Sequence, residues 1–139
     1  MFHKILAAID GSPASEKALA AAVDLAGQYQ AELIALSVAE MPEVVAMVDE
    51  VDELRRSADD YFRQIGEAAL EYARSRGVKL RHVVVRGHAA DEILRFAEAE
   101  GVNLIVVGRQ GHSRVTRFFL GSTTDRVSEH CHCTVMIVK

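Results

Sequence analysis

The residues best suited to chemistry lie in one glycine-rich segment, residues 108–124. Its glycines are Gly108, Gly111 and Gly121, in a spacing of Gly, two residues, Gly, nine residues and then Gly-Ser. Because glycine has no Cβ, backbone N–H groups at these positions can approach an anion closely, and positive φ angles are available where a turn needs them. This pattern predicts a loop that binds phosphate groups.

Two further features of the segment favour an anion. A helix is expected to begin after its last glycine, where free N–H groups and the positive end of the helix dipole contribute about 0.3 to 1 kcal/mol towards an anion. Ser122 and Thr123 add hydroxyl donors there. The segment also contains Arg109, Arg114 and Arg117 and no carboxylate, in a chain with a net charge of −4, so the local field favours phosphate. The alternative is that the glycines only form turns and the arginines are solvated.

Length and charge exclude several classes of protein. A chain of 139 residues is the usual size of one domain. Charged residues interrupt every apolar run well before the roughly 18 residues that a membrane helix needs. The acidic balance argues against a nucleic-acid partner, which would need a basic face. The first residues lead into an apolar run without a cleavage site for a signal peptide, and we therefore expect a cytoplasmic protein.

Apolar runs and amphipathic stretches alternate along the chain. Continuous apolar runs predict strands buried on both faces, and Ser12-Pro13 predicts the start of a helix. This order predicts a single α/β domain over residues 1–139, with a doubly wound parallel sheet of five strands and helices on both faces. The expected strands are 4–9, 32–38, 80–85, 103–107 and 135–138, and the expected helices are 12–26, 54–72, 88–101 and from 121 onwards.

The expected strand order is 3-2-1-4-5, which reverses between the first and the fourth strand. In sheets of this type, ligands bind at the carboxyl ends of the strands where the order reverses. The two loops at that point begin with Asp10-Gly11-Ser12 and with Gly108. The glycine-rich segment is therefore expected to lie at the ligand site.

The second helix is expected to pack through an apolar stripe. The acidic run that precedes it, residues 49–53, is interpreted as a solvated surface, with a mobile lid as the alternative. The stripe recurs at steps of four and three residues and consists of Leu54, Ala58, Tyr61, Ile65, Ala68 and Tyr72.

These features together resemble the universal stress protein family, over essentially the whole chain. The glycine spacing is similar to the motif that separates the ATP-binding members of that family from the others, and it occurs here in the same order of elements. The likeness also includes Ile5–Ser12, Leu36–Val38, Asp91–Leu94, Leu104–Gly108 and Val135–Val138.

The resemblance implies a stress-response or regulatory protein that binds an adenine nucleotide, ATP or else AMP or ADP, with Mg or Mn held by the phosphates. It implies that Asp10 and Gly108 line the ribose, that the backbone of Val38 reads the adenine edge, and that the glycine-rich segment holds the phosphates. No catalytic residue and no protein metal ligand is expected. The expected nucleotide-binding residues are Ala8, Ile9, Asp10, Val38, Gly108, Arg109, Gly111, His112, Gly121, Ser122 and Thr123.

Four positions depart from the usual pattern of the family. Ala8 stands where many members have proline, Asn103 where aspartate is common, and Thr134 where proline usually precedes the last strand. None of these three lies in the glycine-rich segment. The fourth, Thr123, replaces a frequent valine.

An enzymatic function is the main alternative. Asp10, His112 and Ser122 could in principle assemble for phosphoryl transfer, but the chain has no Gly-Lys-Ser/Thr sequence of a P-loop NTPase and no acidic pair for catalytic Mg. A phospho-receiver needs paired acids after the first strand, where Asp10 stands alone. Slow ATP hydrolysis at the same loop stays open as the second function.

Residues 130–133, His-Cys-His-Cys, offer ligand types that zinc and copper prefer. Four adjacent residues cannot all point inward, and so we expect no structural metal. The cysteines are too close in sequence to close a useful disulfide loop, and reduced thiols are expected. The scattered His3, His82 and His88 are expected to be structural.

The last strand is expected to form a homodimer contact. Residues 133–139 form an apolar strand at the edge of the predicted sheet, with no later segment to cover it. Unpaired backbone groups at such an edge favour pairing with a second copy, and the family resemblance implies the same contact.

Overall fold

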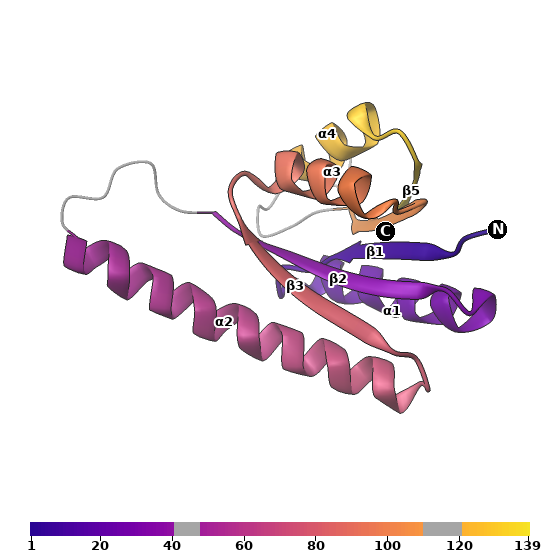
Figure 1. Ribbon diagram of the computed structural model, residues 1–139, viewed down its shortest axis with the longest axis horizontal. Coiled ribbons are helices and arrows are strands. Elements are labelled where there is room, and N and C mark those ends of the chain that lie inside the picture. Colours follow the sequence, from indigo (N-terminus) through magenta and orange to yellow (C-terminus); the bar gives the residue numbers. More distant parts are fainter. Residues whose placement is uncertain (41–47, 110–120) are drawn as a thin grey trace.

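The computed structural model of the protein describes residues 1–40, 48–109 and 121–139, in which five strands and four helices alternate (Figure 1). All strand pairs are parallel and their order is β3-β2-β1-β4-β5, which confirms the predicted α/β fold. In chain order the elements are β1 (Lys4–Ala8), α1 (Pro13–Tyr29), β2 (Glu32–Ala39), α2 (Val48–Ser75), β3 (Leu80–Arg86), α3 (Ala89–Glu100), β4 (Leu104–Gly108), α4 (Ser122–His130) and β5 (Thr134–Val138).

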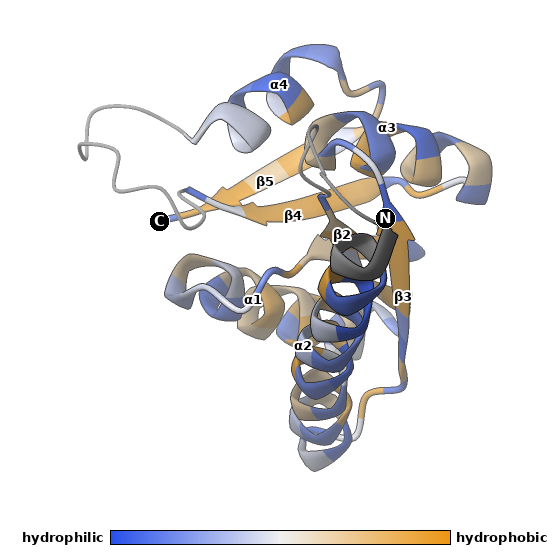
Figure 2. Cartoon of the chain, turned by 90° about the vertical axis from the view of Figure 1, so that its left-hand side faces the viewer, coloured by the Kyte–Doolittle hydropathy of each residue, from blue (hydrophilic) through white to orange (hydrophobic). Residues whose placement is uncertain are grey.

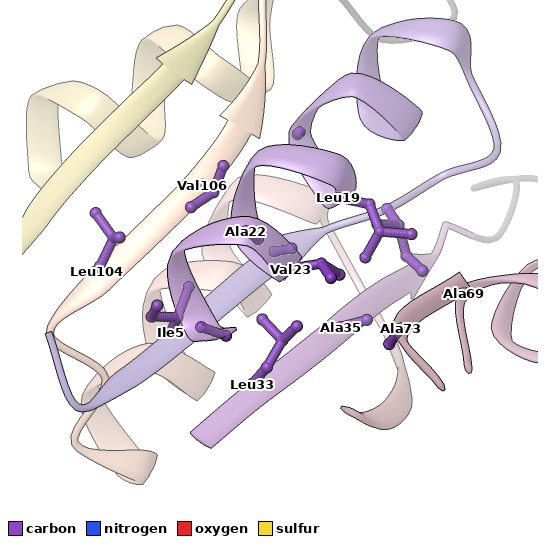
Figure 3. Close-up of a cluster of buried hydrophobic side chains, with 14 residues drawn as sticks. Ile5, Leu19, Ala22, Val23, Leu33, Ala35, Ala69, Ala73, Leu104 and Val106 are labelled. Atoms are coloured by element: carbon purple, nitrogen blue, oxygen red, sulfur yellow. The ribbon is translucent and has the colours of Figure 1, made fainter. Parts of the chain in front are cut away.

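The helices cover both faces of the sheet. Figure 2 shows α1 and α2 on one side and α3 and α4 on the other. Successive side chains of a strand point to opposite faces, and β1 accordingly sends Ile5 towards α1 and Leu6 towards α3, both fully buried. The core under α1 and α2 is drawn in Figure 3. The central strands are therefore apolar without alternation because each face has its own core.

The packed face of α2 overlaps the predicted stripe only in part: Ile65 and Tyr72 of the stripe pack against the core. Leu54 and Tyr61 of that stripe are 41% and 43% exposed. A Cβ at Gly66 would overlap the ring of His82 on β3, so the helix lies too close to the sheet for large side chains at its centre. Small residues therefore occupy the centre of this contact, whereas apolar spacing gives most weight to large ones. Among residues 52–75, the buried positions of α2 are Phe62, Gly66, Ala69 and Ala73.

The ends of α1 explain how β1 and β2 are connected. Ser12 caps the helix by accepting a 3.2 Å hydrogen bond from the N–H of Ser15, and Pro13 supplies a preset φ at the first helical position. At the other end, Gln30 takes a left-handed conformation and returns the chain to the sheet.

Residues 49–53, interpreted from sequence as a solvated run, form the first turns of α2. In the three described ranges, no helix has the length and apolarity to cross a membrane.

Candidate functional site

A cleft opens at the carboxyl ends of β1 and β4, where the strand order reverses. Its volume is about 410 Å3, within the ~300 to 1,000 Å3 typical of small-molecule sites. The fold thus brings residues from the two ends of the sequence to one place. The expected nucleotide-binding residues that line it are Ala8, Ile9, Asp10, Val38, Gly108, Gly121, Ser122 and Thr123.

Three expected residues are not among those that line the cleft. Arg109 is held by its backbone: its N–H donates to Val138 at 3.0 Å and its carbonyl accepts from Gly121 at 2.9 Å. Gly111 and His112 lie outside the described residues. The structure therefore brings together the two sides of the expected site and leaves its outermost part undescribed.

Two helices that the sequence analysis did not assign to the site complete its walls. Tyr61 and Phe62 line the cleft from α2, with their rings edge to face at 5.1 Å between centroids. Ala89 and Ile93 line it from α3. Phe62 and Ile93 are almost fully buried, so this part of the cleft is apolar. The cleft joins an apolar region to a polar end, which suits a ligand with a flat ring and a charged group.

Hydrogen bonds fix the loop after β1. The carboxylate of Asp10 accepts from the N–H of Ser12 at 2.9 Å, and the N–H of Asp10 donates to the hydroxyl of Ser15 at 3.2 Å. From α2, the hydroxyl of Tyr61 donates to the carbonyl oxygen of Asp10 at 2.6 Å. Burial and the nearby Asp10 charge raise the pKa of Tyr61, so its hydroxyl keeps the proton that it donates. Asp10 is thus held in a set position at the cleft.

A buried serine and a half-buried histidine form a polar pair next to the expected base-binding residue Val38. Ser37 is fully buried, its hydroxyl donates to the carbonyl of Ile9 at 2.9 Å, and it lies 2.9 Å from Nε2 of His82. Because the serine proton goes to Ile9, the tautomer that fits has the hydrogen of His82 on Nε2. Burial lowers the pKa of His82, which keeps the ring neutral. A serine within an apolar strand is the signal in the sequence that a buried hydrogen-bond partner is present.

Packing gives Gly108 a reason for being glycine in addition to the predicted one. Its φ is not positive, and a Cβ there would lie 2.6 Å from the carbonyl oxygen of Ala14 in the first turn of α1. Close packing of α1 on β4 therefore excludes a side chain. The carbonyl of Gly108 accepts a 2.7 Å hydrogen bond from the hydroxyl of Thr124, which joins the end of β4 to the start of α4.

The N-termini of three helices lie around the cleft, and they differ in how their N–H groups are satisfied. The first N–H groups of any α-helix lack intrahelical acceptors. The side chain of Ser12 caps α1, and the carboxylate of Glu40 accepts from the N–H of Ala89 on α3 at 2.8 Å. The cap residue of α4 is Gly121, which makes no side-chain cap bond, and Ser122 follows it at the cleft wall. Ser122 and Thr123 therefore bring the positive end of a helix to the cleft wall.

The described part of the chain offers no protein-built metal centre. Within residues 1–40, 48–109 and 121–139, no group of three or more His, Cys, Asp or Glu side chains could hold a metal ion. The carboxylates that line the cleft are Asp10 and Glu40, and both accept backbone hydrogen bonds.

Comparison with known proteins gives one consistent result. The universal stress protein family matches residues 1–139. Universal stress protein YxiE of Bacillus subtilis is 41% identical, with all of both chains covered. The solved structure of protein MJ0577, from Methanocaldococcus jannaschii, has a TM-score of 0.89 and 29% identity, covering 100% of this chain and 96% of that one. A universal stress protein solved in complex with cAMP has a TM-score of 0.78 and 24% identity, covering 99% of this chain and 97% of its own.

Proposed function

The chain belongs to the universal stress protein family, and we propose that it binds an adenine nucleotide, ATP or the shorter ADP or AMP, in the cleft between β1 and β4. The observation that carries this proposal is that Ser122 and Thr123, at the start of α4, line the same cleft as Asp10. A family member of the same fold was solved with cAMP, which is also an adenine nucleotide. The apolar part of the cleft supplies a place for the base.

Each part of the nucleotide has a matching part of the cleft. Backbone N–H groups and hydroxyls at the start of α4 attract phosphate oxygens. The carboxylate of Asp10 can accept hydrogen bonds from ribose hydroxyls, beside Gly108. The backbone of Val38 would read the adenine edge, with Phe62 and Ile93 in the apolar wall. Phosphate-end contacts that lie beyond the described cleft are proposed for Arg109, Gly111 and His112.

Mg or Mn would come with the phosphates. Mg2+ usually keeps several waters and binds through one or two carboxylates together with substrate phosphates. The carboxylates among the described lining residues, Asp10 and Glu40, each already accept a backbone hydrogen bond. This donor set fits an ion that the nucleotide carries better than one that the protein holds.

Binding rather than turnover is the proposed activity. The chain has no Gly-Lys-Ser/Thr sequence of a P-loop NTPase and no acidic pair after the first strand. We propose that the protein acts through a conformation or contacts that depend on the bound nucleotide. Slow ATP hydrolysis is the second candidate, favoured only by the presence of Asp10 in the cleft.

The protein is also proposed to be a homodimer in the cytoplasm, paired through residues 133–139. β5 lies at the edge of the sheet and pairs with β4 on one side. A second copy of β5 could satisfy its other side. Light scattering that finds a monomer at tens of micromolar would contradict this contact.

The proposal is tested first by mass spectrometry of small molecules released from the denatured protein, and then by melting temperature. A ligand at about 100 times its dissociation constant adds roughly 2.7 kcal/mol, or about 5 to 10 °C for a chain near this size. ATP with Mg should shift the melt more than AMP, and GTP should shift it little. Equal shifts with GTP, or none with ATP, would show that the ligand or the site is wrong. Phosphate release measured with ATP decides between binding and hydrolysis.

A further inference from the structure

Two cysteines lie side by side in the short connection between α4 and β5, away from the cleft. Cys131 is the cap residue at the end of α4, where its N–H donates to Val127 at 2.9 Å. Cys133 directly precedes Thr134, the first residue of β5. They are the chain's two cysteines. Both thiols are free and partly exposed in the single chain, and Cys131 lies outside the segment proposed for the dimer contact.

The connection holds the two sulfur atoms together. The Sγ atoms are 3.2 Å apart, and the N–H of Cys133 donates to Sγ of Cys131 at 3.4 Å. A disulfide bond is about 2.05 Å long, so the sulfurs need to approach by only about 1 Å. Residues 131–133 lie outside the helix and the strand, and such a movement leaves the pairing of β4 with β5 in place.

Metal binding fits this pair less well than thiol chemistry. A structural zinc site takes four ligands, but the described residues provide no third His, Cys, Asp or Glu side chain beside the two thiols. His132 lies between the cysteines in sequence and is exposed. Two adjacent thiols without further ligands are the arrangement of a dithiol that can be oxidised.

We propose that Cys131 and Cys133 form a reversible intramolecular disulfide by exchange with a low-molecular-weight disulfide of the glutathione type. The thiolate of Cys131 attacks one sulfur of this disulfide, giving a mixed disulfide and releasing one thiolate. The thiol of Cys133 then gives its proton to the solvent and attacks Sγ of Cys131, which forms the Cys131–Cys133 bond and releases the second thiolate. The protein dithiol loses two electrons and two protons, and the external disulfide gains them as two thiols.

The order of attack follows from the surroundings of the thiols. Burial and the neighbouring Cys131 sulfur raise the pKa of Cys133 to about 12, so Cys133 stays protonated at neutral pH. Because the thiolate is the attacking species, Cys131 reacts first and Cys133 closes the ring.

The resulting bond should be easy to reduce. A ring closed over a single intervening residue removes little entropy from the unfolded chain, so the bond adds little to the stability of the fold. Strained or exposed disulfides are more readily reduced than structural ones. The pair is therefore suited to reversible oxidation and not to a permanent crosslink.

The test uses the full reduced chain in glutathione buffers of increasing oxidised fraction. Free thiols are blocked with a maleimide. The mass of the tryptic peptide 127–139, which contains both cysteines, is then measured by mass spectrometry. The expected product lacks two hydrogen atoms, carries no maleimide and returns to the doubly labelled form on reduction. Two glutathione adducts per chain, a disulfide between two chains, or persistence of two free thiols would each overturn the proposal.

Single variants test the order of attack. Cys131→Ser and Cys133→Ser should each stop at one glutathione adduct, and Cys131→Ser should react about tenfold more slowly because burial raises the pKa of the remaining Cys133 thiol. Equal rates, or the reverse order, would contradict the role given to Cys131. Since neither cysteine lines the cleft, both variants should keep the melting shift with ATP, so that a failure here is distinguishable from a failure of nucleotide binding.

Discussion

The phenolic oxygen of Tyr61 on α2 lies 2.6 Å from the backbone carbonyl oxygen of Asp10, to which it donates a hydrogen bond. This bond ties the long helix to the loop after β1 across 51 positions of sequence. Both residues line the cleft. The position of Asp10 therefore depends on α2, and a ligand that contacts Asp10 is coupled to the helix.

Tyr61→Phe removes this bond and keeps the ring that packs against Phe62. We expect the free energy of unfolding in urea to fall by about 0.5 to 1.5 kcal/mol, and nucleotide affinity measured by calorimetry to fall several-fold because Asp10 is less well positioned. Tyr29→Phe is the matched control, since Tyr29 makes an edge-to-face ring contact with Phe2 that does not need its hydroxyl. Equal effects of the two variants would contradict a role for the Tyr61 bond.

Gly11→Ala should destabilise the protein for two separable reasons. Gly11 has a φ of 84°, and a Cβ there would lie 2.6 Å from the Tyr61 hydroxyl oxygen and 2.9 Å from Cδ1 of Ile65. Gly77 has a φ of 71° with nothing within 4 Å of the added atom. Gly77→Ala should therefore cost about 1 to 2 kcal/mol for backbone strain alone, and Gly11→Ala about 1 to 3 kcal/mol more for overpacking.

A double variant identifies the atom responsible for the overpacking at Gly11. Tyr61→Phe removes the oxygen nearest to the added Cβ, so in urea unfolding it should recover part of the cost of Gly11→Ala, although it destabilises the wild-type chain. Strictly additive losses in this double-mutant cycle would show that the Tyr61 hydroxyl does not determine why residue 11 is glycine.

Ser122→Ala tests the phosphate end of the cleft. It removes one hydroxyl donor at the start of α4 and leaves the backbone N–H groups, so ATP binding should weaken by about 0.5 to 1.5 kcal/mol without being lost. Ser128→Ala is the same change on the same helix, at an exposed position where the hydroxyl bonds to the carbonyl of Asp125. Calorimetry should find wild-type affinity in Ser128→Ala. If Ser122→Ala also bound ATP as tightly as wild type, the phosphates could not lie beside the Ser122 hydroxyl.

The fold was predictable from the sequence because its main signals are local. Continuous apolar runs mark strands with a core on each face, and Ser12-Pro13 marks the start of α1. The face of α2 was not predictable in the same way. The packed face depends on how closely Gly66 of α2 approaches His82 of β3. That distance depends on the residues of the sheet as well as on those of the helix.

The site was predictable to the extent that it lies at strand ends. Asp10, Gly108 and Ser122 follow from the point where the strand order reverses, together with the family resemblance. The pairing of Glu40 with the N-terminus of α3, 49 positions away, does not, because a glutamate after a strand has no local sign of its partner. This contact occupies an N–H group at the start of α3. Only the tertiary structure shows it, because the two residues are far apart in sequence.

The pair of Ser37 and His82 makes stability depend on pH. Burial lowers the pKa of His82 below its usual 6.5, so below about pH 6.5 the unfolded chain binds more protons than the folded one. The free energy of unfolding then falls as the pH falls from 6.5 towards the folded pKa, with a slope of at most about 1.4 kcal/mol per pH unit for one proton. Above about pH 7.5 both states hold a neutral ring, and this contribution no longer changes.

His82→Gln should remove this pH dependence without removing the hydrogen bond. The glutamine Nε2 can donate to the hydroxyl of Ser37 as the histidine Nε2 does, but it does not titrate. Urea unfolding at pH 8 should give the variant a stability within about 1.5 kcal/mol of wild type, since only shape and one neutral hydrogen bond differ. Between pH 7 and 5.5 the wild-type curve should fall and the variant curve should stay nearly flat. If the free energies of unfolding of the two proteins fell in parallel with pH, a group other than His82 would be taking up the proton.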